Sequence, residues 1–307
     1  MFQLFIELLF VGVFAGTKIG IAALGFALIF FTTREMHFAF GALAVMAAYT
    51  CYAVVSALGV GPAGLFLGIP VAFAVTALVS VALHRQIYLR LMSVTPVLLT
   101  SLGISMVLEN SLQILFTPEV QILTYPALTR VAEFGFLRMR VIDIGATVLF
   151  IVIAVALDVF MNHTRLGQGL GATIEDPEMA ELVGIRTARM RVGAYCVGAL
   201  LGATSGIVSL LDTGVRPAGG FLLLLHALIV TILGRGSLRL VAIWSVVFGV
   251  LQSLWAWQFE TGYTELAVFA IVVLYLMARD GWDRWQQHRG KSAGRAPKLA
   301  EAGVSEG

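Results

Sequence analysis

Long apolar runs, separated by short polar stretches, cover the chain from its first residues to about residue 279. A helix needs roughly 20 apolar residues to cross the hydrocarbon core of a bilayer, and most of the runs approach that length. They predict membrane segments at 5–31, 38–57, 62–83, 94–116, 142–161, 192–212, 221–234, 240–257 and 263–279. Segment 221–234 is too short to span, which predicts a half helix, a re-entrant helix or a helix that recruits its neighbours. The pattern therefore predicts eight or nine crossings.

The polar interruption at 162–191 is long enough to hold structure of its own. Asp176 is suited to cap the free N–H groups of a helix, and Pro177 fits the first helical position, where its missing donor costs nothing. Glu178 suits the positive end of the helix dipole, and Gly184 suits a left-handed ending. These residues predict a short capped helix of about two turns.

The predicted helix has an apolar side. Met179, Leu182 and Val183 share one face at i, i+3, i+4 spacing, whereas Glu178 and Glu181 lie to the other side. A short capped helix in a loop of a membrane protein is suited to serve as a docking site for another protein. The alternative is a helix that lies on the membrane or packs against the rest of the chain.

Composition agrees with a membrane protein and narrows its class. Hydrophobic residues make up 59% of the chain and charged residues 12%, far outside ordinary soluble composition. A β-barrel would show short alternating strands, so the expected fold is an all-α polytopic membrane protein with some broken or short helices. Cys51 and Cys196 are interpreted as small buried hydrophobic residues, not as a disulfide or metal pair. The first run lacks the basic start of a signal peptide and is interpreted as a retained helix.

The positions of Lys and Arg predict an orientation. If 162–191 is cytoplasmic and 221–234 crosses, fifteen basic residues lie inside, four lie outside and Lys18 lies in the membrane. This positive-inside bias places the N-terminus outside and the C-terminus inside. The expected domains are a transmembrane domain at 1–280 and a cytoplasmic, mostly disordered tail at 281–307.

The segment 117–141 is expected outside, with two prolines and three arginines. It suits an encounter with a soluble partner, and a plain solvated connection explains it as well.

Three blocks of the chain resemble a known family. Residues 20–49, GIAALGFALIFFTTREMHFAFGALAVMAAY, are similar to the family pattern GLxYxLLALGLxLIYGVxxxxNFAHGELYMLGAY. Residues 164–185, TRLGQGLGATIEDPEMAELVGI, are similar to TRLGRALRAxAQDPEAAxLLGI. Residues 199–251 contain stretches similar to AGVL, SPxxG and LGGxGSxxGAxxGGLLLG. The family is that of the LivH/LivM-type permeases, the membrane subunits of branched-chain amino-acid ABC importers.

The resemblance implies a type II-like ABC importer permease that moves a small polar solute inward. In such importers a cytoplasmic coupling helix of the permease sits in a groove of an ATP-binding subunit. Closure of two ATP-binding subunits then switches the permease between outward and inward states. The coupling helix implied here comprises Glu175, Asp176, Pro177, Glu178, Met179, Ala180, Leu182, Val183 and Gly184.

The resemblance also implies partners and a location. The partners are a second LivM-like permease or a second copy of this chain, two ATP-binding subunits, a periplasmic or lipid-anchored solute-binding protein, and lipid of the bacterial cytoplasmic (inner) membrane. No nucleic acid, metal or resident cofactor is expected, since ATP belongs to the partner subunits. Gly290-Lys291-Ser292 is similar to the end of a phosphate-binding loop, but Trp285 stands where that motif needs its first glycine. The chain is therefore expected to be a transport subunit and not an enzyme.

The chain departs from the family where substrate chemistry is expected. It has His37-Phe38-Ala39-Phe40-Gly41-Ala42 where the family has Asn-Phe-Ala-His-Gly-Glu. The substrate class therefore stays broad: a branched-chain or other amino acid, or a related amide or carboxylate.

Membrane physics adds candidates for the translocation path. Charges within a span are costly and usually face a cavity or a partner, which singles out Lys18 and Glu109, whereas Asp158 and Asp212 are placed near an interface. His37 is interpreted as a hydrated residue at a segment end. Gly41 and the turn 216–220 are interpreted as helix breaks, where irregular backbone can line a cavity. The candidate path residues are Lys18, His37, Phe38, Phe40, Gly41, Glu109, Pro217, Gly219 and Gly220.

Two other functions compete with this interpretation. An ion-coupled secondary transporter or channel acting alone also explains membrane charges and broken helices, but not the isolated capped helix in 162–191. An intramembrane enzyme would need a close set of His, Asp or Ser at helical spacing, which the sequence lacks.

Overall fold

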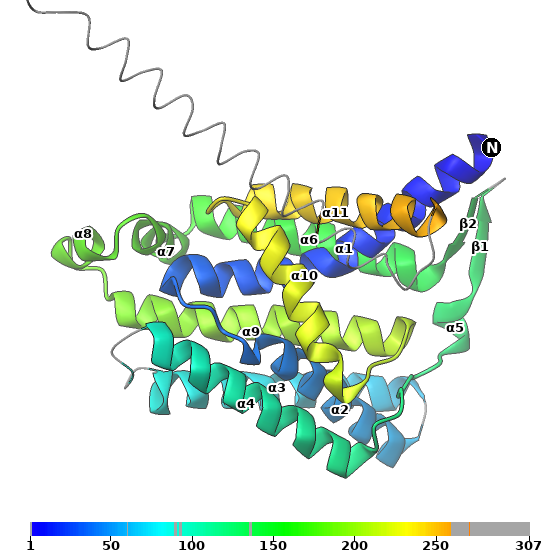
Figure 1. Ribbon diagram of the computed structural model, residues 1–307, viewed down its shortest axis with the longest axis horizontal. Helices are drawn as coiled ribbons and strands as arrows, with labels where there is room; N and C mark the ends of the chain where they lie inside the picture. The colour runs from blue at the N-terminus through cyan, green and yellow to red at the C-terminus, as the bar shows by residue number, and fades with distance from the viewer. Residues whose placement is uncertain are drawn as a thin grey trace, which may run out of the picture. The chain divides into compact units, whose positions relative to one another are not determined.

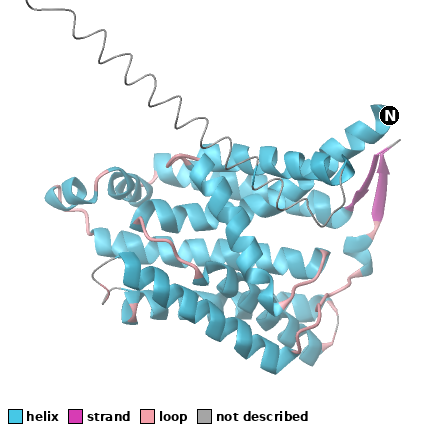
Figure 2. Cartoon of the chain, viewed as in Figure 1, coloured by secondary structure: helices cyan, strands magenta, loops and turns pink. Residues whose placement is uncertain are grey.

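The computed structural model describes residues 2–59, 61–88, 91, 94–134, 137–258 and 270. This part of the chain is almost entirely helical, with one small pair of strands (Figure 2). Seven helices within it are long and apolar enough to cross a membrane. They are α1 (Phe2–Thr33), α2 (Ala39–Leu58), α3 (Pro62–Gln86), α4 (Val94–Phe116), α6 (Val141–His163), α9 (Thr187–Asp212) and α11 (Leu238–Gln258). The predicted class, a polytopic helical membrane protein, is confirmed.

Eight predicted segments coincide with helices, whose ends fall within five residues of the predicted ends. The largest shift is at the start of α9, where polar residues before the apolar run already belong to the helix. The ninth segment, 263–279, lies outside the described residues except for residue 270, and the tail 281–307 lies wholly outside them. Residues up to Leu254 form one compact unit, and a second unit begins at Trp255.

The short predicted segment is a short helix in the structure. α10 (Gly220–Leu233) has 14 residues and follows the 3-10 turn η2 (Pro217–Gly219). It packs against α1 and α2, and Figure 1 shows it running obliquely to the long helices. The predicted short helix is confirmed, and one 3-10 turn directly precedes it.

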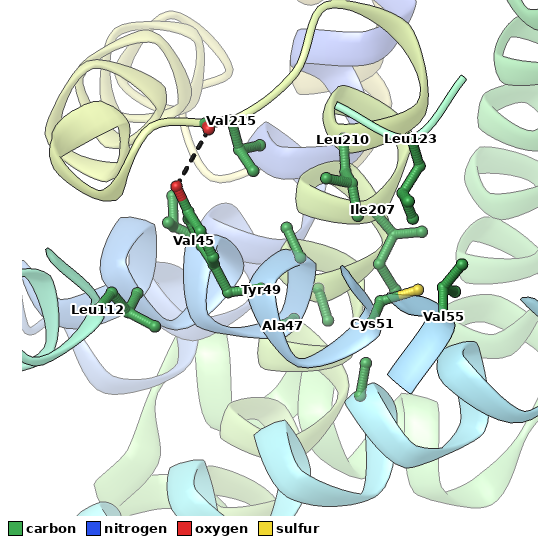
Figure 3. Packing of buried hydrophobic residues seen from close by; sticks show 13 residues of the cluster. Val45, Ala47, Tyr49, Cys51, Val55, Leu112, Leu123, Ile207, Leu210 and Val215 are labelled. Carbon is green, nitrogen blue, oxygen red and sulfur yellow. Dashed lines mark hydrogen bonds between the residues drawn. The ribbon is translucent and has the colours of Figure 1, made fainter. Parts of the chain in front are cut away.

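The core lies where α9 packs against both α1 and α2, with α3 on α2. One buried cluster joins Val45 and Tyr49 of α2 to Ile207 and Leu210 of α9 (Figure 3). The hydroxyl of the fully buried Tyr49 donates a hydrogen bond to the Val215 carbonyl at 3.2 Å, which satisfies its polar end.

Close backbone approach joins α1 to α11. A Cβ on Gly249 would lie 2.2 Å from the backbone nitrogen of Gly16, so the two helices meet where neither has a side chain. The Ser253 hydroxyl donates to the Leu8 carbonyl at 2.9 Å nearby. Small residues and such hydrogen bonds stabilise helix pairs in membranes, where no hydrophobic effect drives association.

The two ends of the unit differ. One end bears α5 (Pro126–Thr129) and the antiparallel strands β1 (Val131–Phe134) and β2 (Leu137–Arg140), whereas the other bears α7 (Arg165–Glu175) and α8 (Pro177–Leu182) (Figure 1). The segment 117–141 therefore contains a helical turn and a hairpin, which the apolar pattern did not predict because the strands have four residues each.

Candidate functional site

The capped helix predicted in the polar loop is present. Asp176 has extended backbone, and its Oδ1 accepts hydrogen bonds from the N–H groups of Glu178 at 3.0 Å and Met179 at 3.1 Å. Pro177 is the first residue of α8, and Gly184 ends the segment with φ 88°. The predicted cap, first residue and left-handed ending are confirmed.

The boundaries of this segment need a correction. Glu175 was predicted in the same helix as Asp176, but it is the last residue of α7. α7 has a cap of its own, because the Thr164 hydroxyl accepts a hydrogen bond from Gly167 N at 2.9 Å. Asp176 thus ends one helix and caps the next, since a residue with extended backbone interrupts the helical ladder.

The apolar side of α8 is open to its surroundings. Met179, Leu182 and Val183 are 62%, 80% and 77% exposed. Ala180 is buried and holds the helix to the chain, and its carbonyl accepts from Ile185 N at 2.9 Å. α8 lies outside the spanning helices, so three large apolar side chains form a free surface on a polar segment.

α7 anchors this surface to the helix bundle. Leu170 of α7 is buried in one cluster with Leu28 of α1 and Ala194 of α9. α7 is therefore packed against both α1 and α9.

Lys18 lies at the centre of a buried ion network. Its Nζ is 2.6 Å from Asp143 Oδ1 of α6 and 2.6 Å from Asp212 Oδ2 of α9. Arg140 Nε is 3.0 Å from Asp143 Oδ2, and Arg140 Nη2 is 2.6 Å from Asp212 Oδ1. Two cations thus face two carboxylates, and the four side chains join α1, α6 and α9.

The network changes the interpretation of Asp212 and adds two residues. Asp212 is the last residue of α9, which agrees with a place near the end of a span, but its side chain is 4% exposed and does not merely touch water. Asp143 and Arg140 were not identified from the sequence. Their i, i+3 spacing at the start of α6 is the local signal that points to a pair. Desolvation lowers the pKa of Arg140, but the hydrogen bonds and charges of Asp143 and Asp212 together outweigh it and raise that pKa.

Two further membrane charges lie apart from this network. Glu109 of α4 is partly exposed, and its carboxylate accepts from the Ser105 hydroxyl at 3.5 Å. Asp158 was placed near an interface, and it pairs with the exposed Arg239, whose Nη2 is 2.9 Å from Asp158 Oδ2. The structure therefore does not bring Lys18 and Glu109 together.

His37 is buried, contrary to the prediction of a hydrated end residue. It is 1% exposed, and its ring lies 5.0 Å from that of Tyr88 and 5.3 Å from that of Tyr195. Its Nδ1 has no hydrogen-bond partner among the described residues. Burial, with the nearby His84, lowers the pKa of His37 to about 3. The residue is therefore neutral at physiological pH.

Gly41 lies inside α2, so the helix does not break there as predicted. A Cβ on Gly41 would lie 1.9 Å from the Gly220 carbonyl oxygen, which shows that α2 and the start of α10 meet backbone to backbone. The turn before α10 was predicted correctly, with Pro217 and Gly219 in η2. Phe40 is buried against Phe26, with ring centroids 5.5 Å apart.

Comparison with known proteins assigns the chain to a family. The pattern of the family described as branched-chain amino acid transport system / permease component matches residues 8–277. The high-affinity branched-chain amino acid transport system permease protein LivH of Escherichia coli (strain K12) is 24% identical over 90% of this chain and 94% of its own length. The high-affinity branched-chain amino acid transport system permease protein BraD of Pseudomonas aeruginosa is 24% identical over 87% of this chain and 92% of its own length.

A third relative and a solved structure agree. The probable branched-chain amino acid transport permease protein LivH of Methanocaldococcus jannaschii is 25% identical over 82% of this chain and 81% of its own. A chain of PsaBC from Streptococcus pneumoniae, solved in complex with Fab, matches with TM-score 0.52 and 14% identity over 90% of this chain and 95% of that one, which shows the fold alone. The chain belongs to the branched-chain amino acid transport system / permease component family.

Proposed function

We propose that this chain is the permease subunit of an ABC importer, driven by separate ATP-binding subunits. We propose further that it moves a small polar solute inward, namely a branched-chain or other amino acid or a related amide or carboxylate. The family membership supports the permease role. The free apolar surface of α8 supports the partnership with an ATP-binding subunit. ATP hydrolysis is assigned to that partner.

The observation that carries the proposal is the combination of a firm cap with an uncovered face on α8. Asp176 fixes the start of the helix, and Ala180 anchors its inner side. The side chains of Leu182 and Val183 remain 80% and 77% exposed. Large apolar side chains in a fixed array act as anchors at protein interfaces once a partner excludes water from them.

The proposed orientation follows from the two different ends. The end with α7 and α8 faces the cytoplasm, and the end with the β1–β2 hairpin faces outward. The excess of basic residues on the α7–α8 side supports this orientation. It places the N-terminus of α1 outside.

Co-purification tests the proposal. The tagged chain is expressed together with ATP-binding subunits from the same genome, as wild type and as Glu178→Ala/Leu182→Asp. The ATP-binding subunits are expected to elute with wild type and to be lost from the double variant. Leu166→Asp on α7, where Leu166 is 62% exposed, is the matched control and should retain them. A wild-type chain that elutes alone would refute the proposal and favour a transporter that works by itself.

The second permease is proposed to cover α4. The exposed face of α6 carries apolar residues such as Val152, which is 58% exposed and suits lipid. α4 exposes Val107 at 65%, but also Asn110 and Ser111, about 9 Å before the end of the helix. Exposed amide and hydroxyl groups at that depth are better matched by protein or by a solvated path than by lipid.

Photo-crosslinking tests this face. A photoreactive phenylalanine analogue replaces Val107 in one variant and Val152 in the other, which are of the same type and similar exposure. Residue 107 is expected to capture the co-expressed second permease, identified by mass spectrometry, and residue 152 is expected to capture lipid. Capture of that permease from residue 152 alone would refute the assignment of α4. The path roles of Lys18, Phe38 and the other candidate path residues stay predictions.

A further inference from the structure

Residues 34–38, here the α1–α2 link, connect α1 to α2 by non-helical backbone up to a final turn. Figure 1 shows the link running from the end of α1 near α7 back toward the middle of the bundle. The link contacts α9, α4, the residues that follow α3, and the α7 helix, as the residues below show. Irregular backbone at such a place persists only where surrounding protein holds it.

Arg34 begins the link in an unusual conformation. Its φ is 60°, and its N–H donates to the Phe30 carbonyl at 2.8 Å, so Arg34 ends α1 in the left-handed region. Glycine usually occupies such a position, because it has no Cβ to clash. Compared with glycine, an arginine at this position retains the backbone strain and contributes a guanidinium group. Strain at an observed backbone outlier is a reason to examine the side chain for a function.

The guanidinium group of Arg34 binds α7. Its Nη2 donates to the carbonyl of Ile174 at 2.9 Å. Ile174 is the second-last residue of α7, and the last carbonyls of a helix lack intrahelical partners. A cation there is also favoured by the helix dipole. Arg34 therefore binds α7 two residues before Asp176, the residue that caps α8.

The following residues attach the link to α9 and to the region after α3. Tyr195 of α9 donates from its hydroxyl to Glu35 Oε2 at 3.4 Å. Burial raises the pKa of Glu35, while the Tyr195 hydrogen bond and the charge of Arg191 oppose that rise. His37 is enclosed by the rings of Tyr88 and Tyr195.

The end of the link attaches to α4. The backbone N–H of Phe38 donates to the hydroxyl of Ser101 at 3.1 Å. The Ser101 hydroxyl in turn donates to the Leu98 carbonyl at 2.9 Å, within α4. A continuous series of contacts therefore runs from α7 through the link to α2 and α4, the helix proposed to face the second permease.

We propose that the α1–α2 link transmits movement of α7 and α8 to α2 and α4, and that Arg34 is the positioning residue that holds the link to α7. The proposal rests on the proposed function, in which an ATP-binding subunit moves α8. Packed segments transmit such movements because they have few alternative arrangements. Loss of the Arg34 side chain should leave assembly intact and weaken the connection between hydrolysis and transport.

Arg34→Gly separates the side chain from the backbone, because glycine adopts the left-handed conformation without strain. Thr117→Gly is the backbone control: it places glycine at a second, exposed residue with positive φ, 70°, after the end of α4. Arg34→Lys restores a charged donor. Each variant is purified with its ATP-binding subunits and reconstituted in liposomes with the solute-binding protein. Solute uptake and ATP hydrolysis are measured on the same sample.

For Arg34→Gly we expect intact assembly, an unchanged melting temperature, and uptake per ATP reduced about fivefold, the scale set by loss of one hydrogen bond. Arg34→Lys should recover most of the uptake, and Thr117→Gly should match wild type. Uptake per ATP unchanged in Arg34→Gly, or reduced equally in Thr117→Gly, would overturn the role of Arg34. A wild-type chain that never retains ATP-binding subunits would instead overturn the proposed function, and this inference with it.

Discussion

Replacement of Lys18 by methionine tests whether the buried ion network holds α1, α6 and α9 together. Methionine keeps the length and apolar stem of lysine and removes the charge. The change takes Nζ away from two carboxylates, each 2.6 Å distant. Arg140 is then the one cation of the network that faces Asp143 and Asp212. The three remaining charged groups carry a net negative charge.

The exposures of the side chains set the size of the effect. The side chains of Asp143 and Asp212 are 11% and 4% exposed, and removal of one partner from such a buried pair costs about 3–5 kcal/mol. Arg140 is 41% exposed, so solvent screens its contribution to about 1 kcal/mol. Lys18→Met should therefore destabilise the fold by roughly 2–4 kcal/mol more than Arg140→Met does.

Unfolding in mixed micelles of increasing sodium dodecyl sulfate fraction, followed by circular dichroism, measures the free energy of both variants. A second comparison uses Lys18→Met/Asp143→Asn, which restores charge balance and should regain at least about 1 kcal/mol relative to Lys18→Met alone. Equal losses for Lys18→Met and Arg140→Met, together with strict additivity in the double variant, would refute the reasoning from burial and charge balance.

Three further predictions follow from local geometry. Asp176→Ala removes the cap of α8 and should destabilise that helix by about 0.5–2 kcal/mol, seen as faster amide hydrogen exchange in α8, and unchanged exchange would contradict the cap. Gly220→Ala places a Cβ 2.7 Å from the Gly41 carbonyl carbon and should lower the melting temperature, whereas Gly219→Ala meets no atom within 4 Å and should not. Burial lowers the pKa of His37 from 6.5 to about 3, so the unfolded state binds the extra proton between those values. Stability should fall by up to about 1.4 kcal/mol per pH unit below pH 6.5, and His37→Phe, titrated in the same way, should remove that part of the slope.

Features encoded within a dozen residues could be predicted from the sequence. The ends of the spans follow from the lengths of apolar runs, and the α8 cap follows from Asp176, Pro177 and Gly184. Each of these features depends on hydrogen bonds and solvation that are determined by residues close together in the sequence. The paired strands at 131–134 and 137–140 were not predicted, because each is too short to show an alternation of apolar and polar residues.

Features that depend on distant pairs could not be predicted. Lys18 was identified as costly in the membrane, but its partners Asp143 and Asp212 lie 125 and 194 residues away along the chain. No local pattern selects them over Glu109. His37 was misplaced for the same reason, since a polar residue at a helix end is hydrated unless other segments cover it. Here Tyr88 and Tyr195 do so.

The uncovered face of α8 has a consequence for how the cell handles the chain before assembly. An isolated subunit presents Met179, Leu182 and Val183 to water on a fixed scaffold, and clusters of this kind promote aggregation. Chaperones and proteases act on exposed apolar surfaces of this kind, so under the proposed function a copy made in excess of its partners should have a short lifetime. The abundance of the complete complex would then be set by its scarcest subunit, with α8 as the mark that distinguishes an orphan from an assembled chain.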